Sequence, residues 1–310
     1  MSLVGFDRLC KDADARKPRA TVAVAGGDDP TVLQALREAT DRGWIAPLVV
    51  GPEKEVRDAA RSARVNLHGF TFHGADGDSV ALAAVAHVRE GRAALLMKGR
   101  ISTPLLMRAV LDPAVGLRTA RVICQVVFME ITRDRRRFLL ADTGISVRPS
   151  LDQKADILRS AVEVAQALGA DRPRVAIMAA TETLNPAMPE TLDAVELAAR
   201  NAAGNLGGCV VQGPLSFDLA YAADAADRKR VSGEVVGAAD VMVFPDLVSA
   251  NLTVKAIMYT ADCRFGGVLR GTSAPVVFMS RADTTATRLQ SLALALRVLD
   301  KSPSREPGGS

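Results

Sequence analysis

The chain has 310 residues, of which 48% are hydrophobic and 24% are charged, so it can bury a sizeable core and is not intrinsically disordered. Its formal net charge is +4, its basic residues are scattered along the chain, and only 4% of its residues are aromatic. These features do not favour nucleic-acid binding, which uses a concentrated basic surface or aromatic stacking platforms.

The N-terminal segment and the cysteines predict a cytoplasmic protein that is neither exported nor embedded in a membrane. The first residues lack an apolar core like that of a signal peptide, and no stretch approaches the roughly 18 apolar residues of a membrane span. The cysteines are far apart and form no CxxC pair, and the three histidines have no metal-ligand spacing with them, so we expect reduced thiols and no metal site. The cysteines are Cys10, Cys124, Cys209 and Cys263.

Short apolar segments alternate with longer segments of helical period, which predicts an α/β fold with a mostly parallel sheet. Helices are expected at 31–42, after a plausible cap at residues 28–30, and at 154–168, which Gly169 closes. The expected strands are 21–25, 46–50, 69–73, 93–97, 121–128, 138–141, 174–179, 208–212, 241–245, 267–269 and 275–279.

About eleven strands exceed what one ordinary sheet holds, so we expect two α/β lobes. The arginine-rich segment 133–137 is typical of a solvated hairpin turn, and anion binding is the alternative.

Polar residues follow several of the apolar strands, at the position where parallel sheets place their ligands. The segment 98–104 offers Lys98, Gly99, Ser102 and Thr103 before a helix, and such a loop can hold a phosphate. The alternative is an ordinary capped turn with Thr103 as N-cap and Pro104 at the first helical position.

Two further loops carry polar groups that could bind a substrate. Asp142 follows the strand 138–141 and precedes two hydroxyl residues at a flexible joint. Asn251 and Lys255 lie four residues apart and can share one face of a helix.

The last such loop places Ser280, Arg281 and Asp283 directly after an apolar strand. A guanidinium group suits phosphate binding, and the start of the following helix adds partial positive charge. The alternative is that Asp283 caps the helix and Arg281 is a surface charge. The GxGxxG, GxxxxGK[ST] and GxSxG fingerprints of nucleotide-binding proteins and hydrolases are absent.

Taken together, these loops resemble the phosphate acetyl/butyryltransferase family over residues 21–299. The matching segments are 96–99 with Ser102 and Thr103, 116–119, Asp142 with 153–155, Glu182 with 185–186, 188–189, 191–194, 213–215, 239–240, 245–246, Asn251, Lys255 and 280–283.

The resemblance implies two α/β lobes with an active-site cleft between them, in an architecture related to isocitrate and isopropylmalate dehydrogenases. It implies that the first lobe is discontinuous, with residues 1–138 and 268–310, and that residues 139–267 form the second. It also implies a homodimer.

Three departures from the family pattern concern substrate choice and proton transfer. Acetyl-specific members carry an aspartate where this chain has Thr287 and an arginine that binds coenzyme A where it has Tyr259. The run 280–283 and Tyr259 favour the butyryl-type branch, so Asp283 becomes the candidate acid or base. Members often have Ser-His in place of Cys124 and Gln125, and Asp in place of Gln212, so a divergent or weakened enzyme stays open.

The implied reaction is reversible transfer of a short-chain acyl group, acetyl to butyryl, between coenzyme A and inorganic phosphate, without a permanently bound cofactor. We expect Arg281 to bind the phosphate, Ser280 to donate to the oxyanion, and Lys98, Thr103, Asn251 and Lys255 to complete the anion pocket. The remaining candidate substrate-binding residues are Gly99, Ser102, Asp142 and Tyr259.

Three alternatives remain. Cys124 could act as a nucleophile in a covalent mechanism. The protein could be a two-lobed coenzyme A ester-binding or regulatory protein without turnover. It could also be a divergent decarboxylating hydroxyacid dehydrogenase, although that activity needs a cluster of acids for a divalent metal, which we cannot assemble from this sequence.

Overall fold

The computed structural model describes residues 2–280 and 282–301. The strands in this part of the chain are β1 (Ala20–Ala25), β2 (Ile45–Gly51), β3 (Thr71–Gly74), β4 (Leu95–Lys98), β5 (Cys124–Ile131), β6 (Arg137–Ala141), β7 (Arg174–Met178), β8 (Val210–Leu215), β9 (Val241–Val243), β10 (Cys263–Arg270) and β11 (Val276–Val277). Each predicted strand overlaps one of them, so the predicted α/β class is confirmed.

These strands form a single eleven-stranded sheet in the order β3-β2-β1-β4-β11-β10-β5-β6-β9-β7-β8. The expectation that eleven strands exceed one sheet is therefore wrong. Most neighbouring strands run parallel, as predicted, while the central pairs β11–β10, β10–β5 and β5–β6 are antiparallel. These antiparallel pairs join two parallel portions of the sheet, which is how the sheet reaches its unusual width.

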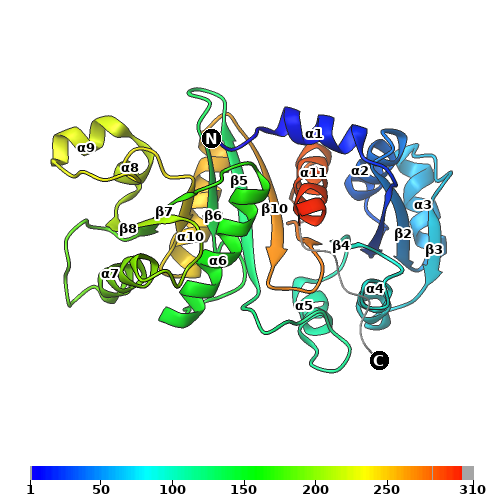
Figure 1. The fold of residues 1–310 in the computed structure, drawn as a ribbon. Helices are drawn as coiled ribbons and strands as arrows, with labels where there is room; N and C mark the ends of the chain where they lie inside the picture. The colour runs from blue at the N-terminus through cyan, green and yellow to red at the C-terminus, as the bar shows by residue number, and fades with distance from the viewer. Residues whose placement is uncertain (1, 281, 302–310) are drawn as a thin grey trace.

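Helices cover both faces of this sheet (Figure 1). They are α1 (Phe6–Ala15), α2 (Pro30–Asp41), α3 (Glu53–Ala63), α4 (Ser79–Arg89), α5 (Thr103–Leu111), α6 (Leu151–Ala167), α7 (Pro189–Ala202), α8 (Phe217–Tyr221), α9 (Ala223–Lys229), α10 (Leu247–Thr260) and α11 (Thr285–Lys301).

Side-chain caps fix where several of these helices begin. Asp29 accepts hydrogen bonds from the amides of Thr31 and Val32 and so starts α2 at the predicted place. At α5 the cap is Ser102, which accepts from the amide of Leu105 at 3.4 Å, and not Thr103 as expected. The prediction was one residue late because either hydroxyl can cap a helix.

The arginine-rich segment forms the predicted turn of the hairpin between β5 and β6. Arg136 donates to the carbonyl oxygen of Gly237 at 2.8 Å, and Arg137 pairs with Glu130 on the neighbouring strand, also at 2.8 Å. At least these two arginines are engaged by groups of the protein itself.

The two faces of the sheet are packed differently. On one face a single apolar core runs through α1, α2, α3, α6, α7 and α11 and includes Val126 and Phe128 of β5. On the opposite face there are two separate cores, one around α4 and α5 and one around α8, α9 and α10. The face with one core is called the shared face below, and the other is called the divided face.

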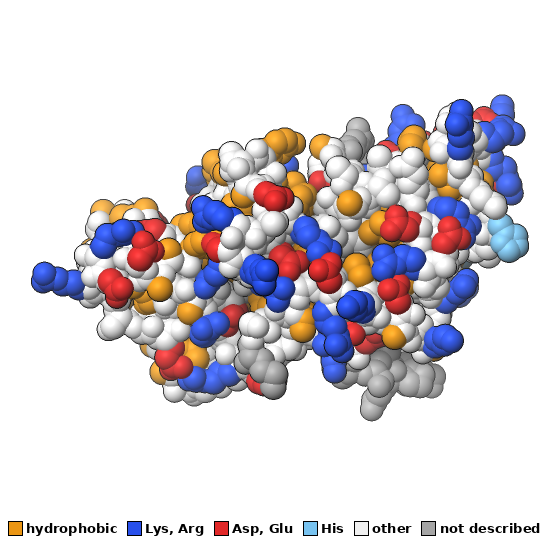
Figure 2. Space-filling view, turned by 90° about the horizontal axis from the view of Figure 1, so that it is seen from above, with side chains coloured by type: hydrophobic (Ala, Val, Ile, Leu, Met, Phe, Trp, Pro, Cys, Tyr) orange, Lys and Arg blue, Asp and Glu red, His pale blue; other side chains and the backbone are white. Residues whose placement is uncertain are grey.

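The surface mixes both signs of charge. On the side shown in Figure 2, Lys and Arg side chains are interspersed with Asp and Glu side chains. Within residues 2–280 and 282–301, no helix is long and apolar enough to cross a membrane.

Candidate active site

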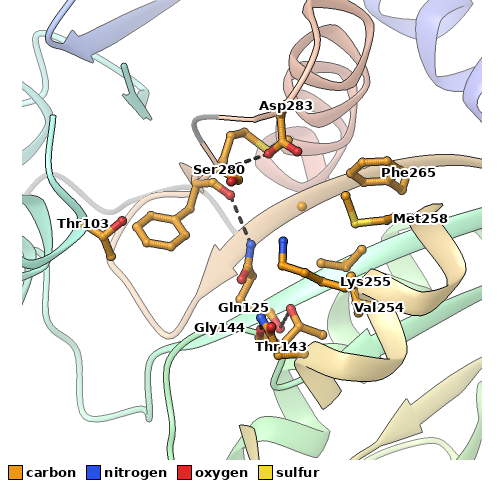
Figure 3. Close-up of a pocket in the computed structure, with 15 residues that line it drawn as sticks. Thr103, Gln125, Thr143, Gly144, Val254, Lys255, Met258, Phe265, Ser280 and Asp283 are labelled. Atoms are coloured by element: carbon orange, nitrogen blue, oxygen red, sulfur yellow. Dashed lines mark hydrogen bonds between the residues drawn. The ribbon is translucent and has the colours of Figure 1, made fainter. Parts of the chain in front are cut away.

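A cavity of about 250 Å³ lies on the divided face, between its two apolar cores (Figure 3). The helices α5 and α10, the central strands β5 and β10, and the loops after β6 and β11 contribute to it. The lining residues are Thr103, Gln125, Val127, Thr143, Gly144, Asn251, Val254, Lys255, Met258, Phe265, Gly267, Phe278, Met279, Ser280 and Asp283.

The antiparallel pair of β5 and β10 forms the floor of this cavity. Gly267 lies directly opposite Val127 in the register of the two strands, and Gln125 lies two residues before Val127 and so on the same face. The side-chain amide of Gln125 donates to the carbonyl oxygen of Phe278 at 3.1 Å. A Cβ on Gly144 would lie 1.9 Å from Oε1 of Gln125, so a larger residue at this position would displace the Gln125 amide.

Ser280 and Asp283 lie in the loop between β11 and α11, and this loop folds back on itself. The amide of Ser280 donates to Oδ2 of Asp283 at 2.6 Å, and Asp283 is only 8% exposed. Burial raises the pKa of Asp283, while this hydrogen bond and the charges of Arg288, Lys255 and Lys98 oppose the rise. Asp283 is thus a desolvated carboxyl group on a cavity wall, as a proton acceptor in a site requires.

Arg288, which does not line the cavity, holds this loop in place. Its side chain is buried, and it donates to Oγ1 of Thr31 at 3.1 Å and to the carbonyl oxygen of Ser280 at 3.4 Å. Burial lowers the pKa of Arg288, and the carboxylates of Asp29 and Asp283 oppose that change. A fixed cation therefore supports the Ser280 loop.

Helix α10 presents one face to the cavity. Asn251, Val254, Lys255 and Met258 follow one another at helical spacing and all line the cavity, so the prediction that Asn251 and Lys255 share a face is confirmed. The side-chain amide of Asn251 donates to the carbonyl oxygen of Thr143 at 3.1 Å. This bond ties the helix to the loop after β6.

The structure brings together five of the described residues that the sequence singled out, namely Thr103, Asn251, Lys255, Ser280 and Asp283. Five others do not line the cavity: Lys98, Gly99, Ser102, Asp142 and Tyr259. Arg281 lies outside the described residues.

The residues outside the cavity differ in what they contact. Lys98 is buried at the end of β4, where its charge acts on Asp283. Gly99 allows a close backbone approach, because a Cβ there would lie 1.7 Å from the carbonyl oxygen of Gly26. Tyr259 is 75% exposed on α10.

Asp142 is buried and clamps its own loop. It accepts backbone hydrogen bonds from Gln125, Gly144, Ile145 and Ser146 at 2.8–3.2 Å. Burial raises the pKa of Asp142, and the hydrogen bonds from Gly144, Gln125 and Ser146 oppose the rise. Both carboxylate oxygens therefore hold the cavity-lining loop in place.

Two alternatives drawn from the sequence need correction, one for Cys124 and one for Asp283. Cys124 is fully buried in the core of the shared face, whereas Gln125 faces the cavity, and burial raises the pKa of the Cys124 thiol. The hypothesis that Cys124 supplies a nucleophile is therefore wrong. The alternative in which Asp283 caps α11 does not hold either. The amide of Thr287, in the first turn of α11, donates to the side-chain oxygen of Thr284 and not to Asp283.

Sequence reasoning missed the apolar lining and Gln125 as a cavity residue. Successive side chains of β5 point to opposite faces of the sheet, which could have indicated that Gln125 and Val127 share a face. Only the register of β5 with β10 places Phe265 and Gly267 beside them. Among residues 2–280 and 282–301, no group of three or more His, Cys, Asp or Glu side chains could hold a metal ion.

An α/β sheet with a cavity that combines a buried carboxyl group, an ammonium group, a hydroxyl group and an apolar wall has the features of a small-molecule site. The chain belongs to the phosphate acetyl/butyryltransferase family, because the sequence profile described as "Phosphate acetyl/butaryl transferase" matches residues 77–296.

Comparison with individual proteins agrees with this membership. The chain is 39% identical over 283 residues to a phosphate butyryltransferase of Clostridium acetobutylicum, covering 91% of this chain and 94% of the relative. It is 37% identical over 291 residues to a phosphate acetyltransferase of Rhizobium meliloti, covering 94% and 92%. The crystal structure of a branched-chain phosphotransacylase from Enterococcus faecalis V583 superposes with a TM-score of 0.80 at 30% identity, covering 90% and 99%.

Proposed function

We propose that the protein is a phosphate acyltransferase that moves a short-chain acyl group between coenzyme A and inorganic phosphate. The observation that carries this proposal is that Ser280, Asp283 and Lys255 meet in one cavity beside an apolar wall, in a chain of this family. An acyl transfer between two anionic substrates needs a cation, an oxyanion donor and a group that exchanges a proton with the thiol.

The reaction can be written for these residues in both directions. From acyl phosphate, the carboxylate of Asp283 accepts the thiol proton, the sulfur attacks the carbonyl carbon, and the carbon–oxygen bond to phosphate breaks. In reverse, a phosphate oxygen attacks the thioester, the carbon–sulfur bond breaks, and the protonated Asp283 returns the proton to the thiolate. In both directions the tetrahedral oxyanion accepts a hydrogen bond from the Ser280 hydroxyl group.

The cations around the cavity serve the phosphate groups. Lys255 lies on the wall, and Lys98 is near enough to act on Asp283, so both lower the cost of bringing anions into the site. Arg281 is assigned to the phosphate on the sequence pattern alone.

Thr103 and Asn251 complete the anion site. Gly99 and Ser102 contribute through the fold of their loop, and Tyr259 would contact coenzyme A outside the cavity.

We also propose the two-lobed arrangement with residues 1–138 and 268–310 in one lobe and 139–267 in the other, in a dehydrogenase-like architecture. The two separate cores of the divided face support it, because the cavity lies between them. The protein would act as a homodimer in the cytoplasm, with coenzyme A and phosphate as substrates and no permanently bound cofactor.

The decisive experiment measures free thiol released from acetyl-CoA, propionyl-CoA and butyryl-CoA, with and without inorganic phosphate. We expect phosphate-dependent release and formation of an acyl phosphate, and much slower release by Ser280→Ala. Binding of a coenzyme A ester without release would instead support a non-catalytic binding protein and contradict the proposal.

A further inference from the structure

One end of the cavity is apolar. Val254 and Met258 of α10, Val127 of β5 and Phe265 of β10 form a wall that we call the acyl wall. In Figure 3, Phe265, Met258 and Val254 lie on the opposite side of Lys255 from Thr103, while Ser280 and Gln125 lie between. The cavity therefore has an apolar wall beyond Lys255, in addition to the apolar residues Phe278 and Met279 that precede Ser280 in the chain.

Gly267 leaves the floor open beside this wall. A Cβ at this position would lie 3.3 Å from Nε2 of Gln125 and 3.5 Å from Cγ2 of Val127. The backbone of Gly267 is not in the left-handed region, so the conformation does not require a glycine here. The absence of a side chain at Gly267 leaves more room in the cavity above the middle of the sheet.

The apolar end has no evident role in binding phosphate or in transferring a proton. A wall made of aliphatic and aromatic groups gains free energy by removing apolar surface of a ligand from water. The acyl chain is the apolar part of the substrate attached directly to the carbonyl carbon, whose oxygen accepts the hydrogen bond from the Ser280 hydroxyl group in the proposed reaction. An acetyl group offers one methyl group to the wall, whereas a butyryl group extends two methylenes further.

We propose that the acyl wall, with Gly267 below it, binds the acyl chain and makes the enzyme favour a four-carbon acyl group over acetyl. This inference depends on the proposed function. One methylene in an apolar pocket changes specificity by roughly 10- to 200-fold, so two methylenes give at least roughly a 10-fold preference.

The test compares kcat/KM for butyryl-CoA and acetyl-CoA in the wild type and three variants. Met258→Ala removes part of the wall, and Gly267→Ala narrows the floor. Leu252→Ala is the matched control, because Leu252 is a 64% exposed apolar residue on the same helix and does not line the cavity. We expect the butyryl-to-acetyl ratio to fall roughly 10-fold in Met258→Ala and in Gly267→Ala and to stay at the wild-type value in Leu252→Ala.

Circular dichroism and thermal melting check that each variant is folded. Should Gly267→Ala fail to fold, Met258→Ala and the volume-conserving Met258→Leu carry the test, and Met258→Leu should restore most of the ratio. A wild-type ratio of one or less overturns the inference, as do ratios in the cavity variants that match Leu252→Ala, and the proposed function survives both results. No phosphate-dependent thiol release from any thioester would overturn the proposed function and this inference with it.

Discussion

The side-chain amide of Gln125 donates to the carbonyl oxygen of Phe278 at 3.1 Å and so links the central strand β5 to the segment that carries Ser280. On its other side, Gln125 approaches Gly144 so closely that a larger residue there would displace its side-chain amide. One side chain on the cavity floor therefore contacts both the loop after β6 and the loop after β11.

We expect Gln125→Met to lower turnover roughly 10-fold, because a shift of the Ser280 segment by even 1 Å misplaces a reacting group. The free energy of unfolding should fall by about 1 kcal/mol through loss of the hydrogen bond. Steady-state kinetics and urea denaturation measure the two effects. Gly144→Ala should give the same loss of turnover by displacing Gln125, and wild-type kinetics in both variants would disprove the linking role.

Asp283→Asn tests the proton acceptor without removing the loop contact, because the Asn side-chain oxygen can still accept from the amide of Ser280. General-base catalysis contributes roughly 10²- to 10⁴-fold, so turnover of acyl phosphate with coenzyme A should fall by that factor.

The pH profile gives a second measure of the same role. Since burial raises the pKa of Asp283, wild-type turnover should rise with pH across a range above that of an ordinary aspartate. This limb should vanish in Asp283→Asn. The variant should also be no less stable than the wild type at neutral pH, because it no longer buries a charge. A retained acidic limb would assign the proton to solvent or to another group.

Arg288→Met and Arg288→Lys separate the charge of Arg288 from its shape. The charge of Arg288 lowers the pKa of Asp283, so Arg288→Met should move the acidic limb of the pH profile to higher pH. Arg288→Lys keeps the charge and should move it less, while both variants lose the fork that holds Thr31 and Ser280. An unchanged pH profile in Arg288→Met, with only a lower melting temperature, would leave Arg288 a purely structural role.

Ser280→Ala should reduce turnover by roughly 10²- to 10³-fold, the usual cost of losing one oxyanion donor. The KM values for both substrates should change little, because the hydroxyl group acts on the transition state. A change confined to KM would assign Ser280 to substrate binding.

Much of the fold followed from local sequence patterns. Every strand overlaps a predicted one because most of them are short β-branched or apolar runs, and the cap at Asp29 follows a common rule. The helix expected at 154–168 begins three residues earlier, at Leu151, because Ser150 caps it. The single sheet could not be predicted, because the pairing of β10 with β5 and β11 joins segments far apart in the chain. Only that pairing places two parallel portions in one sheet.

The site was predictable where a polar residue follows a strand or repeats along a helix, as for Ser280, Asp283, Asn251 and Lys255. The same signal also singled out Asp142, which accepts four backbone hydrogen bonds and holds its own loop. A carboxylate at a strand end can bind a ligand or the backbone, and the sequence does not distinguish these uses. The acyl wall was missed because its apolar residues resemble any core.

The unbroken core of the shared face should make unfolding of the molecule cooperative. In that core, α11 packs against β10 and β11, α6 packs against β5, β6 and β9, and the two helices contact each other. Neither portion of the sheet can therefore lose its structure without exposing apolar surface in this shared core. We therefore expect one cooperative unfolding transition, with calorimetric and van't Hoff enthalpies that agree, although the cavity divides the opposite face. Two resolved transitions in a calorimetric scan would show that the halves unfold independently.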